Sequence, residues 1–545
     1  MKQRLLSRTG GLALCLVFAV ISPERLAEGT ATQDDTAREA KQLLRSGIQA
    51  LDEGRLDDAH VALKRAMELE PEAPEMTFQM GRCFLAMAEE FAADPELGGD
   101  PGSTFFDAAQ FFSTTLEREP GHSRAGLLLA KALYLNGDLE GARESIEAFV
   151  ARFPRQSEGL VEAGRIALSI YTAMGQAEGA SLAAAETYLQ RAIEVDPAGT
   201  EAHRLLGDCR LHGGNTTGAL DAYQEGIARR PGDAELHQRL VTCFQGSEAF
   251  SAAEAVGFYQ ALLKGRDLSK ADEATLWWYQ GTWHDIGGSS AFGAERFEQA
   301  LEEYAASAAS YRRCGEVHPI YEESARSQEA QAFANMGWAA LRAEEYDLSE
   351  AKFGRALYLE TGLENAVLGI DYLGDALIRA QGLAAGRDLF GRAARANPWN
   401  ARWWNNYALF GRETGYFESA YTSYVKAAAL EPGDTRYIND CGMMLLYYLH
   451  REPEKAEAYF REAWRVGEET CSSPFITEAE HKHHFEAYCD AMLNLGRLLL
   501  LQGEVERCEP IARALREKAP RRPDVIQLQL ALKKTKEGQP YMLPE

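Results

Sequence analysis

The chain has 545 residues, more than the roughly 250–300 residues that a single hydrophobic core can organise. It carries 57 basic and 82 acidic residues, a formal charge of -25, which disfavours binding to nucleic-acid phosphates and to anionic membrane surfaces. Because 46% of the residues are apolar, we expect extensive burial, in several domains or in an open array of repeats.

The first 31 residues have the pattern of an export signal. Lys2, Arg4 and Arg8 form a positive start, and an apolar stretch runs over residues 10–21. This stretch is shorter than the ~20 residues that span a bilayer, but it suits the apolar part of a signal peptide. We therefore expect an exported protein, periplasmic or associated with the envelope. An uncleaved N-terminal anchor is the alternative.

A period of 34 residues runs along the rest of the chain, both in small residues late in the expected first helices and in the prolines that end second helices. After each small residue, an alanine follows 12 positions later, an aromatic or aliphatic residue 16 later, and a small residue usually 19 later. Gly207, for example, is followed by Ala219, Tyr223, Gly226 and Pro231. Such spacings place the residues on one helix face, and proline ends a helix because it lacks an N–H.

The unit resembles the tetratricopeptide repeat, in which this period accompanies a signature of aromatic, Leu-Gly, Tyr, Ala, Phe and Pro. The closest units cover residues 42–71, 200–231 and 401–432. We count about twelve units over residues 38–520, several of them degenerate. The resemblance implies an all-α fold, a right-handed superhelical solenoid of helix pairs. The pairs stack because one pair cannot bury its own apolar face.

Residues 265–272 are the expected joint between two blocks of repeats. The N-terminal block covers residues 38–265 and the C-terminal block residues 272–520, and a tail follows at 521–545. The tail is polar at first, so we expect it to be loosely ordered.

Several units are longer than the period. Three of them have extra residues between the first and second helices, the largest insertion lying around residues 89–104. We interpret these insertions as drift in loop length, which costs little; contacts with a partner at one edge of the solenoid are the alternative. Two further excesses, at 311–328 and 467–484, are expected to extend helices or to form caps.

Five cysteines keep the register of the repeat, and small residues in register are most simply part of the core. They are Cys83, Cys209, Cys243, Cys441 and Cys508. Cys471 and Cys489 lie outside this register and are the candidates for a disulfide, although spacing cannot decide whether they pair.

A group of histidines, His481, His483 and His484, lies near these two cysteines. His and Cys together can bind zinc. However, the histidines fit one face of a solvated helix and no Cys-x-x-Cys accompanies them, so we expect no metal and no cofactor. The sequence contains no Gly-x-Ser-x-Gly elbow, phosphate loop, His-Glu-x-x-His or dinucleotide fingerprint, and we expect no enzymatic activity.

Residues that face the groove are the candidates for partner binding. In the family that the chain resembles, positions two, five, nine and twelve of the first helix usually point into the groove. Arginine offers paired donors to a carboxylate, and asparagine can bond a bound peptide's backbone. We therefore predict that the C-terminal groove holds an extended, partly acidic protein segment, although Asp371 and Asp375 dilute its basic character. The predicted partner-binding residues are Trp278, Asn335, Trp338, Arg379, Arg402, Asn405, Asn406, Arg412, Arg436 and Asn439.

The resemblance implies a non-catalytic scaffold that binds a protein or peptide, within an exported or envelope complex, and that does not bind nucleic acid. A structural protein that self-assembles through its repeats is the second hypothesis, and oligomers are compatible with both. A metal-binding or enzymatic role of the C-terminal His/Cys segment is the third.

Overall fold

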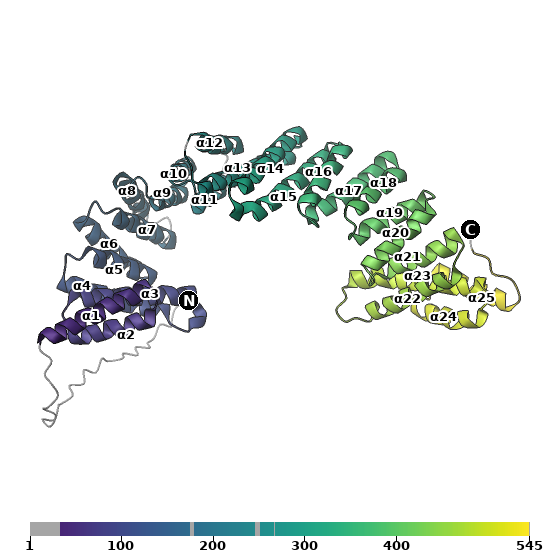
Figure 1. The fold of residues 1–545 in the computed structure, drawn as a ribbon, viewed down its shortest axis with the longest axis horizontal. Helices are drawn as coiled ribbons and strands as arrows, with labels where there is room; N and C mark the ends of the chain where they lie inside the picture. The colour runs from purple at the N-terminus through teal and green to yellow at the C-terminus, as the bar shows by residue number, and fades with distance from the viewer. Residues whose placement is uncertain (1–32, 175–178, 246–250, 266, 544–545) are drawn as a thin grey trace, which may run out of the picture. The chain divides into compact units, whose positions relative to one another are not determined.

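The computed structural model describes residues 33–174, 179–245, 251–265 and 267–543. The expected export signal lies outside these residues. Over the described ranges the chain forms 25 α-helices and no β-strand (Figure 1). The helices make twelve successive pairs followed by one last helix, which confirms the predicted all-α repeat solenoid of about twelve units.

The chain divides into two compact units. Unit 1 comprises residues 1–230 with 238–245, and unit 2 comprises residues 231–237 with 246–545. The division therefore falls within helix α11 (Ala234–Gln245). The joint expected at residues 265–272 stays a prediction.

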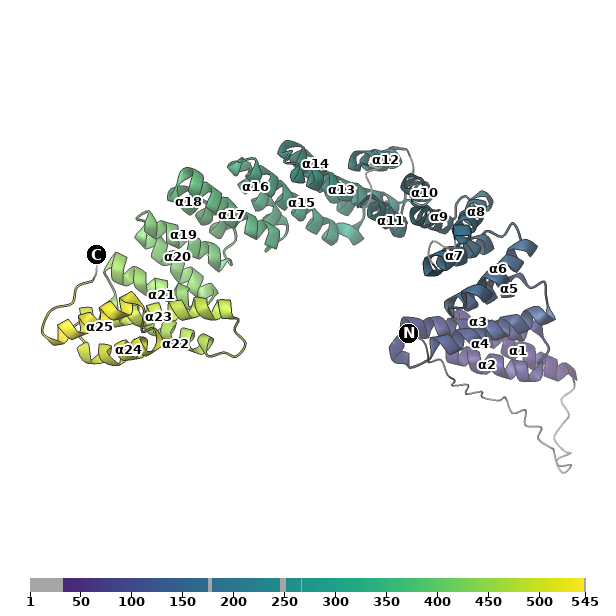
Figure 2. The same ribbon diagram turned by 180° about the vertical axis from the view of Figure 1, so that it is seen from behind.

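The helices of unit 1 pack side by side in chain order, as both views show (Figures 1 and 2). They are α1 (Gln33–Asp52), α2 (Leu56–Leu69), α3 (Pro74–Ala93), α4 (Pro101–Arg118), α5 (Ser123–Leu135), α6 (Leu139–Arg152), α7 (Ser157–Met174), α8 (Gly179–Val195), α9 (Thr200–His212) and α10 (Thr216–Arg229). A 3-10 turn, η1 (Pro95–Leu97), precedes α4.

Unit 2 continues the same pattern of paired helices. They are α12 (Ala252–Lys264), α13 (Lys270–Gly293), α14 (Phe297–Val317), α15 (Glu322–Arg342), α16 (Tyr346–Leu359), α17 (Glu364–Gln381), α18 (Leu383–Ala396), α19 (Ala401–Glu413), α20 (Phe417–Leu430), α21 (Thr435–Met443), α22 (Pro453–Cys471), α23 (Glu478–Leu501), α24 (Val505–Lys518) and α25 (Pro523–Lys536). A 3-10 turn, η3 (Pro319–Tyr321), precedes α15, and a π-helical segment, η4 (Met444–Leu449), prolongs α21.

The small residue of a first helix lets an aromatic or aliphatic side chain of the second helix approach its backbone. A Cβ atom at Gly207 would lie 2.2 Å from the ring of Tyr223, and one at Gly374 would lie 2.4 Å from the ring of Phe390. In both pairs the ring follows the glycine by 16 positions, as the periodicity predicts. This close approach joins the two helices of a pair, and stacked pairs then share a continuous core.

The extra residues of the long units form helix more than loop, so the prediction of loop drift is wrong for the α13–α14 pair. Here α13 runs for 24 residues and only residues 294–296 separate it from α14. The added turns of the helix place Ala291 in the core. The two later excesses do extend helices, as predicted: α14 runs to Val317 and α22 to Cys471.

The expectation of a loosely ordered tail is wrong for residues 523–536, which form α25. Val525, Leu528 and Leu532 are spaced on one face of this helix and are buried against the preceding pair. The last pair of a repeat stack leaves an apolar face open, and α25 covers it.

The five register cysteines are buried, which confirms that they belong to the core. Cys489 is also buried and Cys471 is half-buried, and both thiols are free within the described part of the chain. None of the described helices combines the length and apolar character needed to cross a bilayer.

Candidate functional site

The two tryptophans predicted to bind a partner are half-buried in contacts between helices. Trp278 packs edge-on against Tyr311 of α14, with ring centroids 5.3 Å apart. Trp338 donates a hydrogen bond from Nε1 to Oδ1 of Asn365 at 2.8 Å, which ties α15 to α17. Both rings hold neighbouring helices together and offer only part of their surface to a partner.

The four predicted asparagines are largely used inside the repeat stack. Asn335 accepts hydrogen bonds at 3.0 and 3.2 Å from two neighbouring amides. Asn405 and Asn439 are buried, and Asn439 accepts a hydrogen bond from Nδ2 of Asn494 at 3.0 Å. Asn406 is half-buried. Asn335 and Asn439 thus link repeats, which leaves these two amides little capacity for the backbone of a peptide.

The predicted arginines differ in how far they are engaged. Arg402 pairs with Asp371 of α17 at 3.1 Å, and Arg412 pairs with the adjacent glutamate at 2.7 Å. The guanidinium of Arg436 lies 5.3 Å from the ring centroid of Tyr437, and its buried Nε has no hydrogen-bond partner in the described structure. Arg379 is exposed. The carboxylates of the same groove thus neutralise part of its basic character.

Sequence reasoning missed Asp440, a carboxyl group of α21 near two of these arginines. Burial raises its pKa from 3.8 to about 7, although the charges of Arg412 and Arg436 act in the opposite direction. Asp440 is at position six of its first helix, which is not one of the usual groove positions. The available signal was its place four residues after Arg436, on the same helix face.

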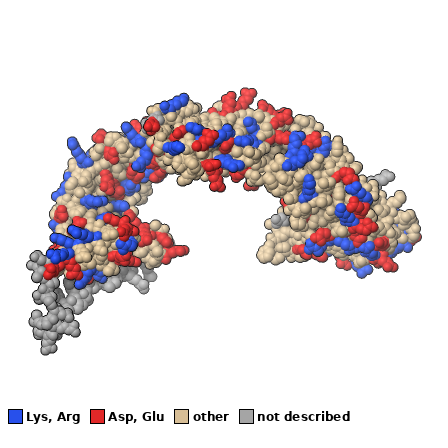
Figure 3. All heavy atoms as spheres, in the orientation of Figure 1, with Lys and Arg blue, Asp and Glu red and all other residues tan. Residues whose placement is uncertain are grey.

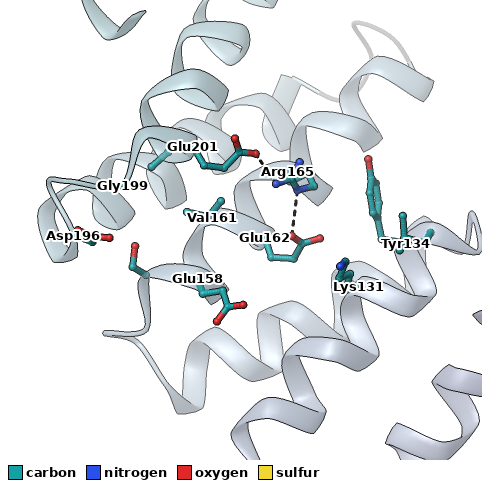
Figure 4. Close-up of a pocket in the computed structure, with 12 residues that line it drawn as sticks. Lys131, Tyr134, Glu158, Val161, Glu162, Arg165, Asp196, Gly199 and Glu201 are labelled. Carbon is teal, nitrogen blue, oxygen red and sulfur yellow. Dashed lines mark hydrogen bonds and ion pairs between the residues drawn. The ribbon is translucent and has the colours of Figure 1, made fainter. Parts of the chain in front are cut away.

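The first-helix face of unit 1 contains a hollow that was not predicted (Figure 4). It has a volume of ≈ 610 Å³ and lies among the consecutive first helices α5, α7 and α9. We call it the unit 1 hollow. Its charged and aromatic lining comprises Lys131, Tyr134, Glu158, Glu162, Arg165, Asp196 and Glu201.

A row of alternating charges crosses this face from α3 to α11. Its members come from first helices only, so each ion pair either stays within one helix or joins neighbouring repeats. The pairs, at 2.6 to 3.6 Å, are Glu89–Lys131, Glu162–Arg165, Arg165–Glu201, Arg204–Glu201, Arg204–Asp208 and Arg239–Asp208. Applying the groove positions to the N-terminal block would have found several of them, including Lys131, Arg165 and Glu201.

The row leaves unused acceptor capacity inside the hollow. Oε1 of Glu162 is buried and has no hydrogen-bond partner among the described residues, and burial raises the pKa of this carboxyl despite the charge of Arg165. Glu158 is exposed at the same site. The lining holds four carboxylates and two cations, so the hollow favours a ligand that brings a positive charge or an N–H donor.

The described residues give little support for a surface of one charge or for a metal site. Lys and Arg are interspersed with Asp and Glu over the visible surface of both units (Figure 3). His481 and His483 are exposed on α23. Within the described ranges, no three His, Cys, Asp or Glu side chains are grouped as metal ligands would be.

The fold defines a helix-pair repeat protein. Two segments, residues 105–159 and 177–234, match family models described as tetratricopeptide repeat. They contain α5 and α9, two of the three helices around the unit 1 hollow. Both matches lie on the array of helix pairs, so the chain contains tetratricopeptide repeats. The general function supported by such repeats is that of a scaffold for protein–protein interaction.

Solved structures of similar repeat proteins cover parts of this chain. A tetratricopeptide repeat protein from Parabacteroides merdae is 14% identical, with a TM-score of 0.32, over 52% of this chain and 99% of its own. TTC0263 from Thermus thermophilus is 21% identical, with a TM-score of 0.28, over 38% and 99%. MamA from Desulfovibrio magneticus is 20% identical, with a TM-score of 0.29, over 36% and 97%. No curated protein matches the sequence.

Proposed function

We propose that this protein is a non-catalytic scaffold that holds an extended segment of a partner polypeptide on its first-helix face. The unit 1 hollow is the main contact in this proposal. The observation that supports it most is the buried carboxylate oxygen of Glu162, which lacks a hydrogen-bond partner among the described residues and therefore has a strong demand for a donor.

The charges of the hollow suit a polypeptide. Lys131 and Arg165 can donate to backbone carbonyl groups or to carboxylates, and Glu158 and Glu162 can accept from backbone N–H groups or from a basic side chain. An extended strand presents donors and acceptors in alternation along its length. The row of alternating charges on the first helices matches this pattern better than it matches a ligand of one sign.

Photo-cross-linking from inside the hollow tests this proposal. A p-benzoylphenylalanine at Glu158 should capture a polypeptide when the chain is irradiated in its native cell, and Arg165→Glu should reduce the yield. The matched control is the same group at Glu147, which is exposed on second helix α6. Equal capture from both positions, or capture only at Glu147, would contradict the assignment of the hollow.

We further propose that the protein works after export, in the periplasm or in an envelope complex. The pattern of residues 1–31 supports this compartment. N-terminal sequencing of the protein purified from its native cell should begin beyond the apolar stretch at residues 10–21. An intact Met1 in a cytosolic fraction would refute the proposal, and an intact Met1 in the membrane fraction would favour the anchor.

A further inference from the structure

In unit 2, five successive connections from a second helix to the next first helix each expose one large apolar side chain. These side chains are in or beside η3, at the end of α16, between α18 and α19, at the end of α20, and between α22 and α23. Their exposed fractions are 76% for Ile320, 71% for Tyr358, 52% for Trp399, 40% for Leu430 and 93% for Phe475. Among the described residues, the equivalent connections of unit 1 expose only Val195 in this way.

Two recesses lie along four of these connections. The first, ≈ 400 Å³, is lined by Pro319 and Glu322 beside η3 and by Leu359 at the end of α16. The second, ≈ 260 Å³, is lined by Trp399 and by Glu431 of the following connection, together with residues at the end of α16. We call this surface, from Ile320 to Leu430, the apolar edge of unit 2.

Hydrogen bonds hold the first two connections in place. Nε of Arg326 donates to the carbonyl oxygen of Leu359 at 2.9 Å, and Oγ of Ser327 donates to Oε2 of Glu360 at 2.6 Å. The backbone of the two connections that carry Ile320 and Tyr358 is therefore fixed by hydrogen bonds. Large exposed apolar side chains among polar ones are typical of interaction sites, because their exposure to water has a free-energy cost that a partner removes.

The charges around this edge are acidic. The four connections, residues 316–323, 358–364, 397–401 and 430–434, contain seven Glu or Asp residues and no Lys or Arg. Arginines on the neighbouring helices offset part of this charge: Arg312 pairs with Glu329 at 2.6 Å and Arg313 with Glu316 at 3.4 Å. Arg326 lines the first recess, and Arg355 lies 5.2 Å from the ring centroid of Tyr358. An anionic lipid surface would be repelled by these carboxylates, whereas a cationic polypeptide would be attracted.

From this juxtaposition we propose that the apolar edge of unit 2 is a second docking surface, for a polypeptide segment that combines apolar with Lys or Arg side chains. Apolar side chains of the segment pack on Tyr358 and on Trp399 at the second recess. Its cations lie beside carboxylates such as Glu431. This surface is separate from the unit 1 hollow, so the failure of either assignment leaves the other intact.

Three synthetic peptides of equal length test the chemistry. The first combines Leu with Lys, the second replaces each Lys by Glu, and the third replaces each Leu by Ser. Binding to the purified full chain is followed by fluorescence anisotropy of a label on each peptide. We expect the Leu/Lys peptide to bind at least tenfold more tightly than the other two, and Glu431→Lys to weaken its binding.

The location of the docking surface is tested with the double variant Tyr358→Ser/Trp399→Ser, which should bind the Leu/Lys peptide at least tenfold more weakly than the unchanged chain does. Tyr416→Ser is the matched control, because Tyr416 is an exposed aromatic residue of unit 2 in a first-to-second helix connection. Circular dichroism melting should be unchanged for both variants, since all three side chains are exposed.

Three results would overturn the proposal. Peptide affinity that is equal for the double variant and the unchanged chain would show that the edge is not the site. Light scattering that finds a dimer, converted to a monomer by the double variant, would identify a second copy of this chain as the occupant. Binding of the chain to phosphatidylglycerol vesicles, abolished by the double variant, would identify a lipid surface instead.

Discussion

Replacing Gly337 by alanine should destabilise the α15–α16 pair, even though alanine is the better helix former. A Cβ atom at Gly337 would lie 2.6 Å from the ring of Phe353, which is fully buried. The ring has little room to move, because it is also packed against α17: it lies 2.2 Å from the position of a Cβ at Gly369. Trp338 also packs edge-on against it, with ring centroids 5.6 Å apart.

The magnitude follows from two opposing terms. Alanine gains about 1 kcal/mol over glycine inside a helix. Overpacking a closed core costs about 1–3 kcal/mol. Because the ring is held by two helices, the cost for Gly337→Ala should lie near the upper end of this range. The net loss should therefore be about 1–2 kcal/mol. Gly354→Ala on α16 is the control, because a Cβ there meets no described atom within 4 Å, so this variant should gain about 1 kcal/mol.

Hydrogen exchange followed by mass spectrometry is the appropriate assay, because long repeat arrays need not unfold in one step. Peptides from α15 and α16 should exchange faster in Gly337→Ala and more slowly in Gly354→Ala than in the unchanged chain. Thermal melting followed by circular dichroism should rank the three proteins in the same order. If Gly337→Ala protects these helices as well as Gly354→Ala does, the close approach of small residue and aromatic ring does not hold the pair together.

Three further predictions concern single features. Because burial raises the pKa of Asp440 to about 7, the folded chain binds the proton of this carboxyl group more tightly than the unfolded chain does. The contribution of this proton to the free energy of unfolding is complete below pH 4 and is lost as the pH rises through 7. Relative to Asp440→Asn, the free energy of unfolding in urea should therefore fall by at most about 4 kcal/mol from pH 4 to pH 8, and parallel profiles would contradict this. Arg402→Glu with Arg436→Glu should reduce the capture of an acidic peptide by about threefold to tenfold; undiminished pull-down would refute the predicted C-terminal groove. Leu528→Ala should cost about 2–5 kcal/mol and open α25 to proteolysis, and an equally resistant C-terminus would show that this helix does not cap the stack.

The helix pairs could be predicted because their cause lies in local spacing. A glycine in a first helix and a ring 16 positions later, such as Gly207 and Tyr223, meet whenever both helices form. The same register placed Cys83 and Cys508 in the core. The order of residues 523–536 was hidden for the opposite reason: α25 depends on the open face of the pair before it, and about half of its own residues are polar.

The binding surfaces were harder to predict, because a groove position says where a charge lies and not whether another charge already satisfies it. Arg402 was read as a site for an acidic partner, yet Asp371, one repeat earlier, lies 3.1 Å from it. Arg165 and Glu201 pair in the same way across repeats in unit 1. On both faces a polar atom is left without a hydrogen-bond partner among the described residues: Oε1 of Glu162 in unit 1, and Nε of Arg436 in unit 2. Both faces thus keep unsatisfied polar groups after neighbouring repeats have paired their charges. Which groups remain unsatisfied depends on how the repeats stack, so spacing in the sequence could not predict it. The unit 1 hollow is preferred as the place where a partner makes its polar contacts because its ≈ 610 Å³ also offer room for that partner beside Glu162.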